Sequence, residues 1–594
     1  RTLTLGGALA MTGGSIDGAA AAQLVLGGNV TATSSASAGS VIGVATALAG
    51  ARTFSVNAGA VQPELRLGGN ITNGPATGSI TKVGAGTMLM QPPSGNLYTG
   101  PTAVNDGRLQ INSPVTPSIP TGALTIGDGI GSPGSAVVQA LIEDDIKAPT
   151  TVNADGLLDM GQFGQNLPSL TINDGEMRVG VGAAAFTGQL SMTGGAITGA
   201  GSLNIGAFSG PPTLTLTSSA TGPARLAHTD GTFVNATTTM TVNAGVAPEF
   251  TVAGSIQVIG GGRLIKQGAG TALLKGSMID QGALDVNAGT LIAEQPLLLA
   301  STVGPGATFA PQASIGTSTV NGTLRPGPGT SVGGALSFGA TGVLKVTVPS
   351  AVPAEAPRLN VVGAVAIASG ATLDLRIASG VVLQPGTLLQ LITNDLADAI
   401  TGKFANAPAG AFTEPGGHAL SITYAGGTGN DLEATVVAIP PTPTAPTPPT
   451  PSTPPTPPKP TSEPAAVPAP STKPADLTRL RLAPKSFRAA SSGGSLTTKT
   501  STRSTTVRFT LNAPSTVEFT VSRERPGIRS GAKCVAVPKR RPAKAKRCTR
   551  LVPTGTFSTS AAAGEATLRF TGRIGTRALA AGAYELAARP TGGV

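Results

Sequence analysis

The sequence predicts an all-β protein with three parts: a parallel β-solenoid, a proline-rich linker and a small antiparallel β-sandwich. Gly and Pro together supply more than a fifth of the 594 residues, which disfavours helix as the main element. Only 3% of the residues are aromatic, and none is Trp. The core must therefore be built from small aliphatic side chains, as in thin and repeated layers. The third observation is an internal repeat.

The repeat is marked by a turn in which an aliphatic residue is followed by Asn, any residue and Gly. Copies at residues 56–59, 104–107, 172–175, 242–245 and 286–289 are separated by 48, 68, 70 and 44 residues. Division by two, three, three and two gives about 22 to 24 residues per unit, a length typical of solenoid coils. A second motif, at residues 82–87, recurs at 266–271, which is eight units of about 23 residues. We therefore expect about nineteen coils over residues 1–439.

Short segments between these turns alternate aliphatic and polar residues, for example residues 214–216 and 372–377. One face of such a segment is apolar and the other is polar, as in a strand. If each strand pairs with its equivalent in the next coil, every backbone amide finds a partner. Asn and Gly supply the left-handed backbone that the corners need. The arrangement is a parallel β-helix.

Two stretches carry a resemblance to a known family. The sequence Lys-Val-Gly-Ala-Gly-Thr at residues 82–87 is followed by Tyr-Thr-Gly at 98–100 and by Val-Asn-Asp-Gly-Arg-Leu at 104–109. This stretch resembles the autotransporter-associated β-strand repeat, and residues 266–291 resemble a second copy. The resemblance implies an extracellular β-helical passenger, and hence a secreted or cell-surface protein.

A linker divides the chain at residues 440–474, where sixteen of thirty-five residues are proline. This composition favours polyproline II and forms a semi-rigid spacer. Charge divides at the same place, because 22 Lys and Arg stand against 5 Asp and Glu after Pro474 but 18 against 24 before it. The net charge of +11 therefore combines an acidic part with a basic one.

The basic part, residues 475–594, contains alternating segments at 506–511 and 517–521 that predict a β-hairpin. Further alternation near residues 568–570 and 584–586 predicts a small antiparallel sandwich. In pattern and size this part resembles the immunoglobulin-like modules of secreted bacterial proteins. The Cys-Trp-Cys signature of antibody domains is absent.

Cys534 and Cys548 are the only two cysteines of the chain, and they lie 14 positions apart. A disulfide is the interpretation that we favour, and two free thiols are the alternative. Closing a loop of this length would contribute about 3 kcal/mol.

Basic residues surround the two cysteines, and no acidic residue lies among them. The cluster consists of Lys533, Lys539, Arg540, Arg541, Lys544, Lys546, Arg547 and Arg550. These residues are candidates for binding a polyanion such as a cell-wall polymer, lipid headgroups or nucleic acid, of which nucleic acid is the least expected. A solvated loop explains the cluster more simply, and we favour that interpretation.

Several short motifs suggest chemistry without its structural context. Residues 329–333 spell the serine-hydrolase elbow, but no helix is expected to follow. Residues 129–134 fit a dinucleotide-binding fingerprint in letters only and predict a loop. Residues 426–431 resemble one calcium-binding nonapeptide turn, but Glu433 occupies the apolar position and no consecutive turns follow. We expect no catalytic, nucleotide-binding or calcium-binding role for these three motifs.

The remaining candidates are acidic or imidazole side chains. Glu143, Asp144 and Asp145 could bind a metal or act on a polysaccharide, but a solvated acidic patch is the simpler expectation. His228 and His418 lack a partnered Ser, Cys or carboxylate motif, so we expect both on the surface. No catalytic residue, metal ligand or cofactor is predicted.

The sequence thus predicts a non-enzymatic, adhesin-like structural protein that is secreted or lies on the cell surface. Its candidate partners are an anionic envelope polymer, which the basic module could bind, and a host or environmental surface. The alternative is a polysaccharide-binding or polysaccharide-cleaving β-helix, although sugar stacking usually uses Trp and Tyr, and the chain has three Tyr and no Trp. We expect no small-molecule substrate. We also expect no transmembrane segment, because no apolar run approaches the ~18 residues that a membrane helix needs. The chain begins at Arg1 without a signal peptide, so we expect the protein to continue upstream.

Overall fold

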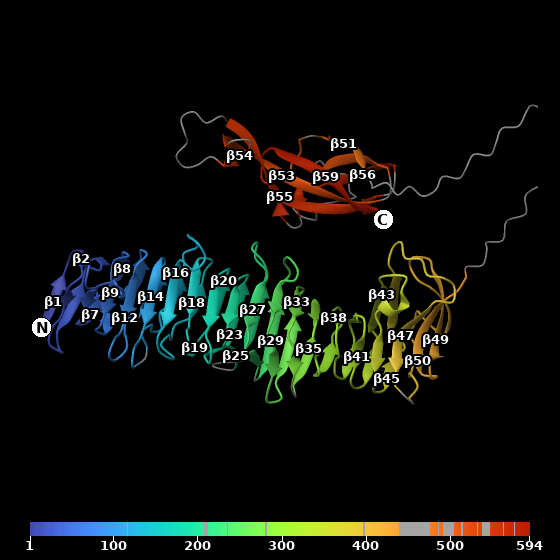
Figure 1. Cartoon of the computed structure of the whole chain (residues 1–594), viewed down its shortest axis with the longest axis horizontal. Coiled ribbons are helices and arrows are strands. Elements are labelled where there is room, and N and C mark those ends of the chain that lie inside the picture. The colour runs from blue at the N-terminus through green and yellow to red at the C-terminus, as the bar shows by residue number, and fades with distance from the viewer. Residues whose placement is uncertain are drawn as a thin grey trace, which may run out of the picture. The chain divides into compact units, whose positions relative to one another are not determined.

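The computed structural model describes residues 1–115, 117–206, 212–234, 236–279, 282–395, 398–438, 476–484, 486–490, 504–512, 515–530, 533–536, 547–561, 564–574 and 577–593. The chain forms two compact units, Arg1–Pro441 and Thr442–Val594 (Figure 1). The linker that was expected at residues 440–474 lies outside the described residues.

The first unit is a three-faced parallel β-solenoid, seen in Figure 1 as a stack of short strands. Each coil adds one strand to face 1, then one to face 2 and, in most coils, one to face 3. Equivalent strands of successive coils pair in parallel, so that their backbone groups are satisfied by the neighbouring coils. The predicted fold class, all-β with a parallel solenoid followed by small antiparallel sheets, is confirmed.

Within the described residues face 1 contains seventeen strands. They are β2 (Leu9–Thr12), β5 (Val30–Thr33), β8 (Ala51–Val56), β11 (Ser79–Val83), β13 (Thr102–Val104), β15 (Leu124–Ile126), β17 (Thr150–Val152), β20 (Leu170–Asn173), β23 (Gln189–Thr193), β26 (Thr213–Thr217), β29 (Thr237–Val242), β32 (Arg263–Gln267), β35 (Ala283–Val286), β37 (Ala300–Val303), β39 (Ser318–Val320), β42 (Leu336–Phe338) and β45 (Val365–Ile367).

Face 2 follows face 1 in every coil and likewise contains seventeen strands within the described residues. They are β3 (Ser15–Ile16), β6 (Ser40–Ile42), β9 (Leu65–Leu67), β12 (Thr87–Met90), β14 (Gly107–Ile111), β16 (Ala136–Ala140), β18 (Gly156–Asp159), β21 (Glu176–Val179), β24 (Ala196–Gly199), β27 (Ala224–His228), β30 (Phe250–Val252), β33 (Thr271–Leu274), β36 (Thr290–Ala293), β38 (Thr308–Pro311), β40 (Thr323–Leu324), β43 (Val343–Val348) and β46 (Thr372–Ile377).

Face 3 is less regular, and single-residue bridges at Ile119, Leu297 and Ile315 take the place of strands in some coils. Its strands are β1 (Thr2–Leu5), β4 (Gln23–Leu26), β7 (Ala45–Leu48), β10 (Ile71–Asn73), β19 (Gln165–Leu167), β22 (Ala184–Thr187), β25 (Ser202–Ile205), β28 (Thr232–Val234), β31 (Ile256–Val258), β34 (Met278–Ile279), β41 (Thr330–Val332), β44 (Leu359–Val361) and β47 (Leu388–Asn394). A short 3₁₀ helix, η1 (Pro353–Glu355), precedes β44.

The coil length agrees with the predicted repeat on average but not coil by coil. Sixteen register steps lead from β2 to β45, and their mean length is close to the predicted unit of about 22 to 24 residues. The step from Val286 to Val303 is among the shortest on face 1, whereas the step from Phe338 to Ile367 is the longest. Each Asn-x-Gly turn closely follows or overlaps the end of a face 1 strand, and the strands are two, three, three and two steps apart, as predicted.

The prediction of about nineteen coils was wrong, because the C-terminal part of the unit stops coiling. Strand β47 pairs in parallel with β44 on one side and antiparallel with β50 (Asp431–Val436) on the other. Strand β50 continues the antiparallel sheet through β49 (Ala419–Gly426) and β48 (Gly410–Thr413). This antiparallel cap pairs with the edge of β47 that would otherwise end face 3 unpaired.

The solenoid interior is a ladder of aliphatic side chains in register. On face 1, for example, Val104, Ile126, Val152 and Ile172 stack from coil to coil, and each of them is fully buried. Burying each such side chain contributes about 1.5–3 kcal/mol. The inward side chains of the three faces meet in one continuous hydrophobic cluster.

The second unit contains two antiparallel sheets that share one core. The first sheet consists of β51 (Leu477–Ala483), β52 (Thr505–Leu511) and β56 (Gly564–Phe570). The second consists of β53 (Ser515–Ser530), β54 (Lys533–Ala536), β55 (Arg547–Ala561) and β59 (Tyr584–Gly593). A short pair, β57 (Arg573–Ile574) with β58 (Arg577–Ala578), accompanies them.

The predicted hairpin of residues 506–511 with 517–521 was wrong. Strand β52 hydrogen-bonds to β51 and β56, whereas β53 lies in the other sheet, and the two strands face each other across the core. The rings of Phe509 and Phe519 meet there with their centroids 5.6 Å apart. An alternating pattern gives each strand an apolar side but does not decide whether two strands pair edge to edge or pack face to face.

Candidate functional site

One buried polar site of the solenoid occurs twice, at the corner between faces 1 and 2. Lys82 in β11 and Lys266 in β32 point inward and are fully buried. The Nζ atom of Lys82 donates hydrogen bonds to the carbonyl oxygens of Gly84 (2.6 Å) and Asp106 (2.8 Å). Lys266 Nζ donates to Gly268, Gly270 and Ala288 at 2.6–2.8 Å. We call these two sites the lysine clamps.

A buried glutamate completes each clamp from the preceding coil. Glu64 accepts hydrogen bonds from the backbone N–H groups of Gly59 (2.9 Å) and Thr87 (2.8 Å). Glu249 does the same with Gly245 (2.8 Å) and Thr271 (2.7 Å). The carboxylate therefore joins two successive corners, and its charge faces that of the lysine in a region shielded from water.

The corner of the following coil closes each clamp through a glycine. Gly107 and Gly289 adopt positive φ angles of 67° and 64°. A Cβ atom on Gly289 would lie 2.5 Å from the carbonyl oxygens of Gly268 and Gly270 and 2.6 Å from Lys266 Nζ. Gly107 is enclosed in the same way. The recurring Lys-x-Gly-x-Gly-Thr and Asn-x-Gly motifs are therefore adjacent layers of one structure.

The sequence interpretation found both motifs but missed the clamps. A signal was present, because Lys82 lies two residues after Ile80 and is in phase with the buried positions of its strand. Lys266 is in phase with Leu264 in the same way. A lysine at an inward position must find several acceptors, and the glycine-rich corner offers unblocked carbonyl groups.

Burial lowers the pKa of both clamp lysines from 10.5 to about 8, although Asp106 and Glu64 raise that of Lys82 and Glu249 raises that of Lys266. The unfolded chain therefore binds more protons than the folded chain between about pH 8 and 10.5, and the free energy of unfolding should rise with pH in that window.

We expect this pH dependence to appear as a higher melting temperature at pH 9.5 than at pH 7.5. The measured quantity is the change in melting temperature between pH 7.5 and pH 9.5, compared between the wild type and the Lys82→Met, Lys266→Met double variant. The contributions of titratable groups that both proteins share cancel in this comparison. An equal pH dependence in the two proteins would contradict the assignment to these lysines.

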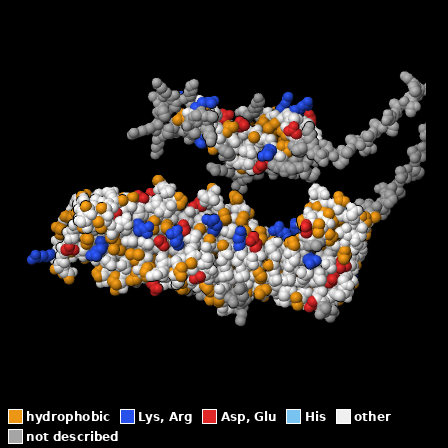
Figure 2. Space-filling view, viewed as in Figure 1, with side chains coloured by type: hydrophobic (Ala, Val, Ile, Leu, Met, Phe, Trp, Pro, Cys, Tyr) orange, Lys and Arg blue, Asp and Glu red, His pale blue; other side chains and the backbone are white. Residues whose placement is uncertain are grey.

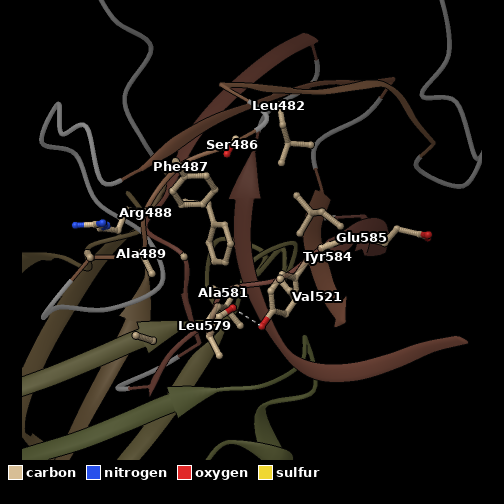
Figure 3. Close-up of a pocket in the computed structure, with 18 of the residues that line it drawn as sticks. Leu482, Ser486, Phe487, Arg488, Ala489, Val521, Leu579, Ala581, Tyr584 and Glu585 are labelled. Carbon is tan, nitrogen blue, oxygen red and sulfur yellow. Dashed lines mark hydrogen bonds between the residues drawn. The ribbon is translucent and has the colours of Figure 1, made fainter. Parts of the chain in front are cut away.

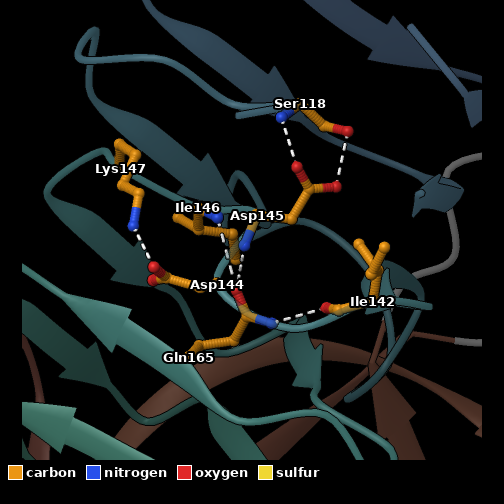
Figure 4. Close-up of polar contacts among 7 residues, drawn as sticks. All are labelled: Ser118, Ile142, Asp144, Asp145, Ile146, Lys147 and Gln165. Carbon is orange, nitrogen blue, oxygen red and sulfur yellow. Dashed lines mark hydrogen bonds and ion pairs between the residues drawn. The ribbon is translucent and has the colours of Figure 1, made fainter. Parts of the chain in front are cut away.

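The acidic turn at residues 143–145 is not the solvated patch that was expected (Figure 4). Only Glu143 is exposed, while Asp144 forms an ion pair with Lys147. Asp145 is fully buried and accepts hydrogen bonds from the Ser118 hydroxyl (2.6 Å) and backbone N–H groups. Burial raises the pKa of Asp145, against these hydrogen bonds. The carboxylate holds adjacent coils together, a role that a run of acidic letters does not reveal.

The expectation for the two histidines was wrong in different respects, because His228 is buried and His418 has a carboxylate partner. His228 at the end of β27 is 2% exposed, and its Nε2 lies 3.0 Å from the Thr232 hydroxyl. Burial lowers the pKa of His228. His418 is partly buried in the cap, with its Nδ1 2.6 Å from the buried carboxylate of Glu414. Burial would raise the pKa of Glu414, but hydrogen bonds from the Gly416 backbone and from His418 hold it below its ordinary value.

The three short motifs lie in turns or in a regular strand. Residues 330–332 of the elbow-like motif form β41, and the Ser331 hydroxyl donates to that of Ser314. Residues 129–134 form an exposed loop between β15 and β16, as predicted. Residues 426–431 connect β49 and β50, and Asp431 accepts a hydrogen bond from the backbone of Asn394 (2.8 Å). The described residues contain no group of three or more metal-ligating side chains.

Cys534 and Cys548 form a disulfide between β54 and β55, with their Cα atoms 6.1 Å apart. Of the basic cluster, Lys533 begins β54, whereas Arg547 and Arg550 belong to β55. Lys539, Arg540, Arg541, Lys544 and Lys546 lie outside the described residues. The sheet therefore brings both ends of the basic loop to the disulfide.

The second unit also has a pocket of about 1380 Å³ beside its core (Figure 3). Apolar side chains such as Leu482, Phe487 and Leu579 line it, and the Tyr584 hydroxyl at its edge donates to the Ala580 carbonyl. No charged pair converges in it, since Arg488 and Glu585 point away from each other in Figure 3. The described residues that line the pocket therefore offer mainly hydrophobic contact.

Side chains of both charges are scattered over the visible side of the solenoid, among uncharged surface (Figure 2). In the described part of the chain, no helix has the length and apolar character needed to span a membrane. The polar sites above are thus structural joints between coils, and the candidate functional regions are the outer faces of the solenoid and the basic end of the second unit.

Comparison with known proteins agrees with this geometry. Residues 80–111 and 264–293 match the family model of the passenger-associated-transport-repeat. These are the two stretches that carried the sequence resemblance, and they hold both clamp lysines and glycines. Together they cover about a tenth of the chain.

Among solved structures, the chain is similar to the crystal structure of the Haemophilus influenzae Hap adhesin, with 10% identity and a TM-score of 0.25. The match covers 70% of this chain and 64% of that one, so this chain spans less than two thirds of the adhesin structure. No curated protein matches the sequence.

Proposed function

We propose that this protein is a secreted or surface-exposed, passenger-like structural protein with an adhesive role and no enzymatic activity. The observation that carries the proposal is the placement of two passenger-associated-transport-repeat segments at equivalent corners of a long parallel solenoid. An interior filled with aliphatic side chains stiffens such a solenoid and displays long outer faces to a partner.

An extracellular location is supported by the disulfide and by the match to a passenger repeat. Disulfides persist in oxidising compartments and are rare in the cytosol. The joints between coils use buried Lys, Glu and Asp side chains.

The adhesive role is tested by coating beads with the full chain and measuring their retention under flow on abiotic and cell surfaces. Retention above that of beads coated with an unrelated protein supports the proposal. Incubation of the same preparation with plant and bacterial glycans tests the alternative. Release of reducing sugar would contradict the proposal and favour a polysaccharide-cleaving protein.

We further propose that the basic loop of the second unit binds an anionic envelope polymer. Arg547 and Arg550 lie beside the disulfide, which gathers the flanking cations at one end of a sheet. Clustered cations bind polyanions by displacing their counterions, so the affinity should fall steeply as salt rises.

The expected result is that the full chain binds heparin at low salt and that Arg540→Ala, Arg541→Ala and Arg547→Ala together weaken this binding. The control replaces three exposed arginines elsewhere on the same unit, Arg481, Arg508 and Arg589, by Ala. Titration with labelled heparin at several salt concentrations measures the affinity of the wild type and of both triple variants. Binding that is independent of salt, or equally weakened by both triple substitutions, would exclude a site at this loop.

A further inference from the structure

One outward position in the middle of face 1 is occupied by Thr or Ser in eight of nine successive coils. Parallel pairing places these residues directly above one another. The residues in order are Thr53, Thr81, Ala103, Thr125, Thr151, Thr171, Ser191, Thr215 and Thr241. We call this column the threonine ladder.

The ladder widens into an array in the coils of β23, β26 and β29. Positions two residues to either side of the column carry further hydroxyl groups, which are also in register. These are Thr193, Thr213, Thr217 and Thr239. Hydroxyl groups therefore repeat at about 4.8 Å along the solenoid and at about 6.6 Å across it.

The threonine ladder is uncharged and its hydroxyl groups are unpaired. From β8 to β29, the strand positions in phase with the ladder hold no Lys, Arg, Asp or Glu. The first charged residues on this side are Arg263 and Asp285, which pair with each other at 2.6 Å. No ladder hydroxyl hydrogen-bonds to another group within the described residues. Thr215 is exposed, and the other seven hydroxyl-bearing residues are partly exposed.

Threonine also fixes where these groups point. Its branched Cβ restricts the side chain to few rotamers, so each methyl and hydroxyl group repeats with the backbone. Little side-chain entropy is then lost when a partner contacts the row. A partner that contacts many coils at once must itself repeat at a fixed distance, carry no charge, and both donate and accept hydrogen bonds.

We propose that the threonine ladder binds ice. An ice face is rigid and periodic, and its water molecules both donate to and accept from a hydroxyl group, while the methyl groups fit the spaces between them. Each contact is weak, but nine coils bound together give a large combined affinity. The inference goes beyond the proposed function, because binding to ice requires only the solenoid and not its attachment to a cell.

A glycan surface fits the ladder less well. Sugar rings are usually bound by stacking on aromatic side chains. Of the three Tyr in the chain, Tyr98 and Tyr424 are buried, and Tyr584 belongs to the second unit. The face 1 strands contain Phe54 and Phe338, but both rings are buried. The described strands of face 1 therefore expose no aromatic ring for a glycan surface, but they carry the hydroxyl array that an ice face would need.

The test uses the full chain and follows its incorporation into a slowly grown ice hemisphere, together with inhibition of ice recrystallisation. We expect the wild type to enter the ice and to inhibit recrystallisation. The variant Thr125→Lys, Thr151→Lys, Thr171→Lys should lose both effects, because its long charged side chains hold the face away from the lattice. The control introduces three Lys at partly exposed positions of face 2, Thr251, Thr290 and Thr308, and should retain both.

Circular dichroism and melting temperature establish that both triple variants are folded. The proposal is overturned if the wild type is excluded from ice like an unrelated protein, or if the two variants behave alike. Binding of the wild type to crystalline cellulose or chitin without any effect on ice would assign the ladder to a polysaccharide instead. These outcomes do not affect bead retention, so the proposed adhesive function is tested separately.

Discussion

Replacement of Lys266 by Met is expected to destabilise the solenoid by about 3–5 kcal/mol. The substitution keeps most of the side-chain volume but removes the charge that faces the buried carboxylate of Glu249. It also removes the donor from three backbone carbonyl groups at the corner. An uncompensated buried charge and unpaired acceptors are both costly in an interior that excludes water. Denaturation followed by circular dichroism measures the change.

The neighbouring surface provides a matched control for this prediction. Lys275 directly follows β33 and is exposed, so Lys275→Met should change the stability by less than about 0.5 kcal/mol. The double variant Lys266→Met, Glu249→Gln should recover part of the loss, since it no longer buries a lone charge. If Lys266→Met were as mild as Lys275→Met, the clamp would not contribute to stability.

Substitution of Gly289 by Ala is expected to cost at least about 3 kcal/mol. The left-handed backbone at φ 64° alone disfavours a side chain by about 1–2 kcal/mol. In addition, the new Cβ atom would lie 2.5–2.6 Å from two carbonyl oxygens and from Lys266 Nζ. Relief of these contacts requires the corner to open, which separates the lysine from its acceptors.

Substitution of Gly306 separates the two causes of this loss, which are the strained backbone and the crowding of the new Cβ atom. Gly306 has a similar φ of 77°, but a Cβ atom there would meet nothing within 4 Å. Gly306→Ala should therefore show the backbone cost alone, about 1–2 kcal/mol. Hydrogen exchange of the amides in β32 and β35 shows whether the damage is local to the clamp. Equal losses in the two variants would mean that crowding at the clamp plays no part.

The repeat could be predicted because the corners of the coils recur in the sequence as Asn-x-Gly turns. Every Asn-x-Gly turn lies at the end of a face 1 strand, and the number of coils between turns follows from their spacing. The average spacing cannot show which coils are short, as from Val286 to Val303, or long, as from Phe338 to Ile367. Loops between strands can vary in length without disturbing the pairing of the strands. Nor does the average spacing show where coiling ends and the antiparallel cap begins. The number of coils was overestimated for these reasons.

The buried polar groups could not be predicted with equal success. Asp145 and His228 look like surface residues in the sequence, and both are buried by contacts with residues of neighbouring coils or turns. Lys82 differs, because its phase within β11 marks it as inward-facing. The pairing of β52 was missed since alternation does not select a partner strand. Local patterns thus predict orientation, whereas partners depend on the whole fold.

The parallel pairing of the coils has a mechanical consequence. Backbone hydrogen bonds between coils run along the length of the solenoid, so a pulling force applied to its two ends loads them one coil at a time rather than all together. Under tension the coils should peel off in sequence, and each should lengthen the tether by the stretch of chain that it contains. A solenoid loaded in this way would therefore extend gradually and dissipate mechanical energy instead of breaking at once.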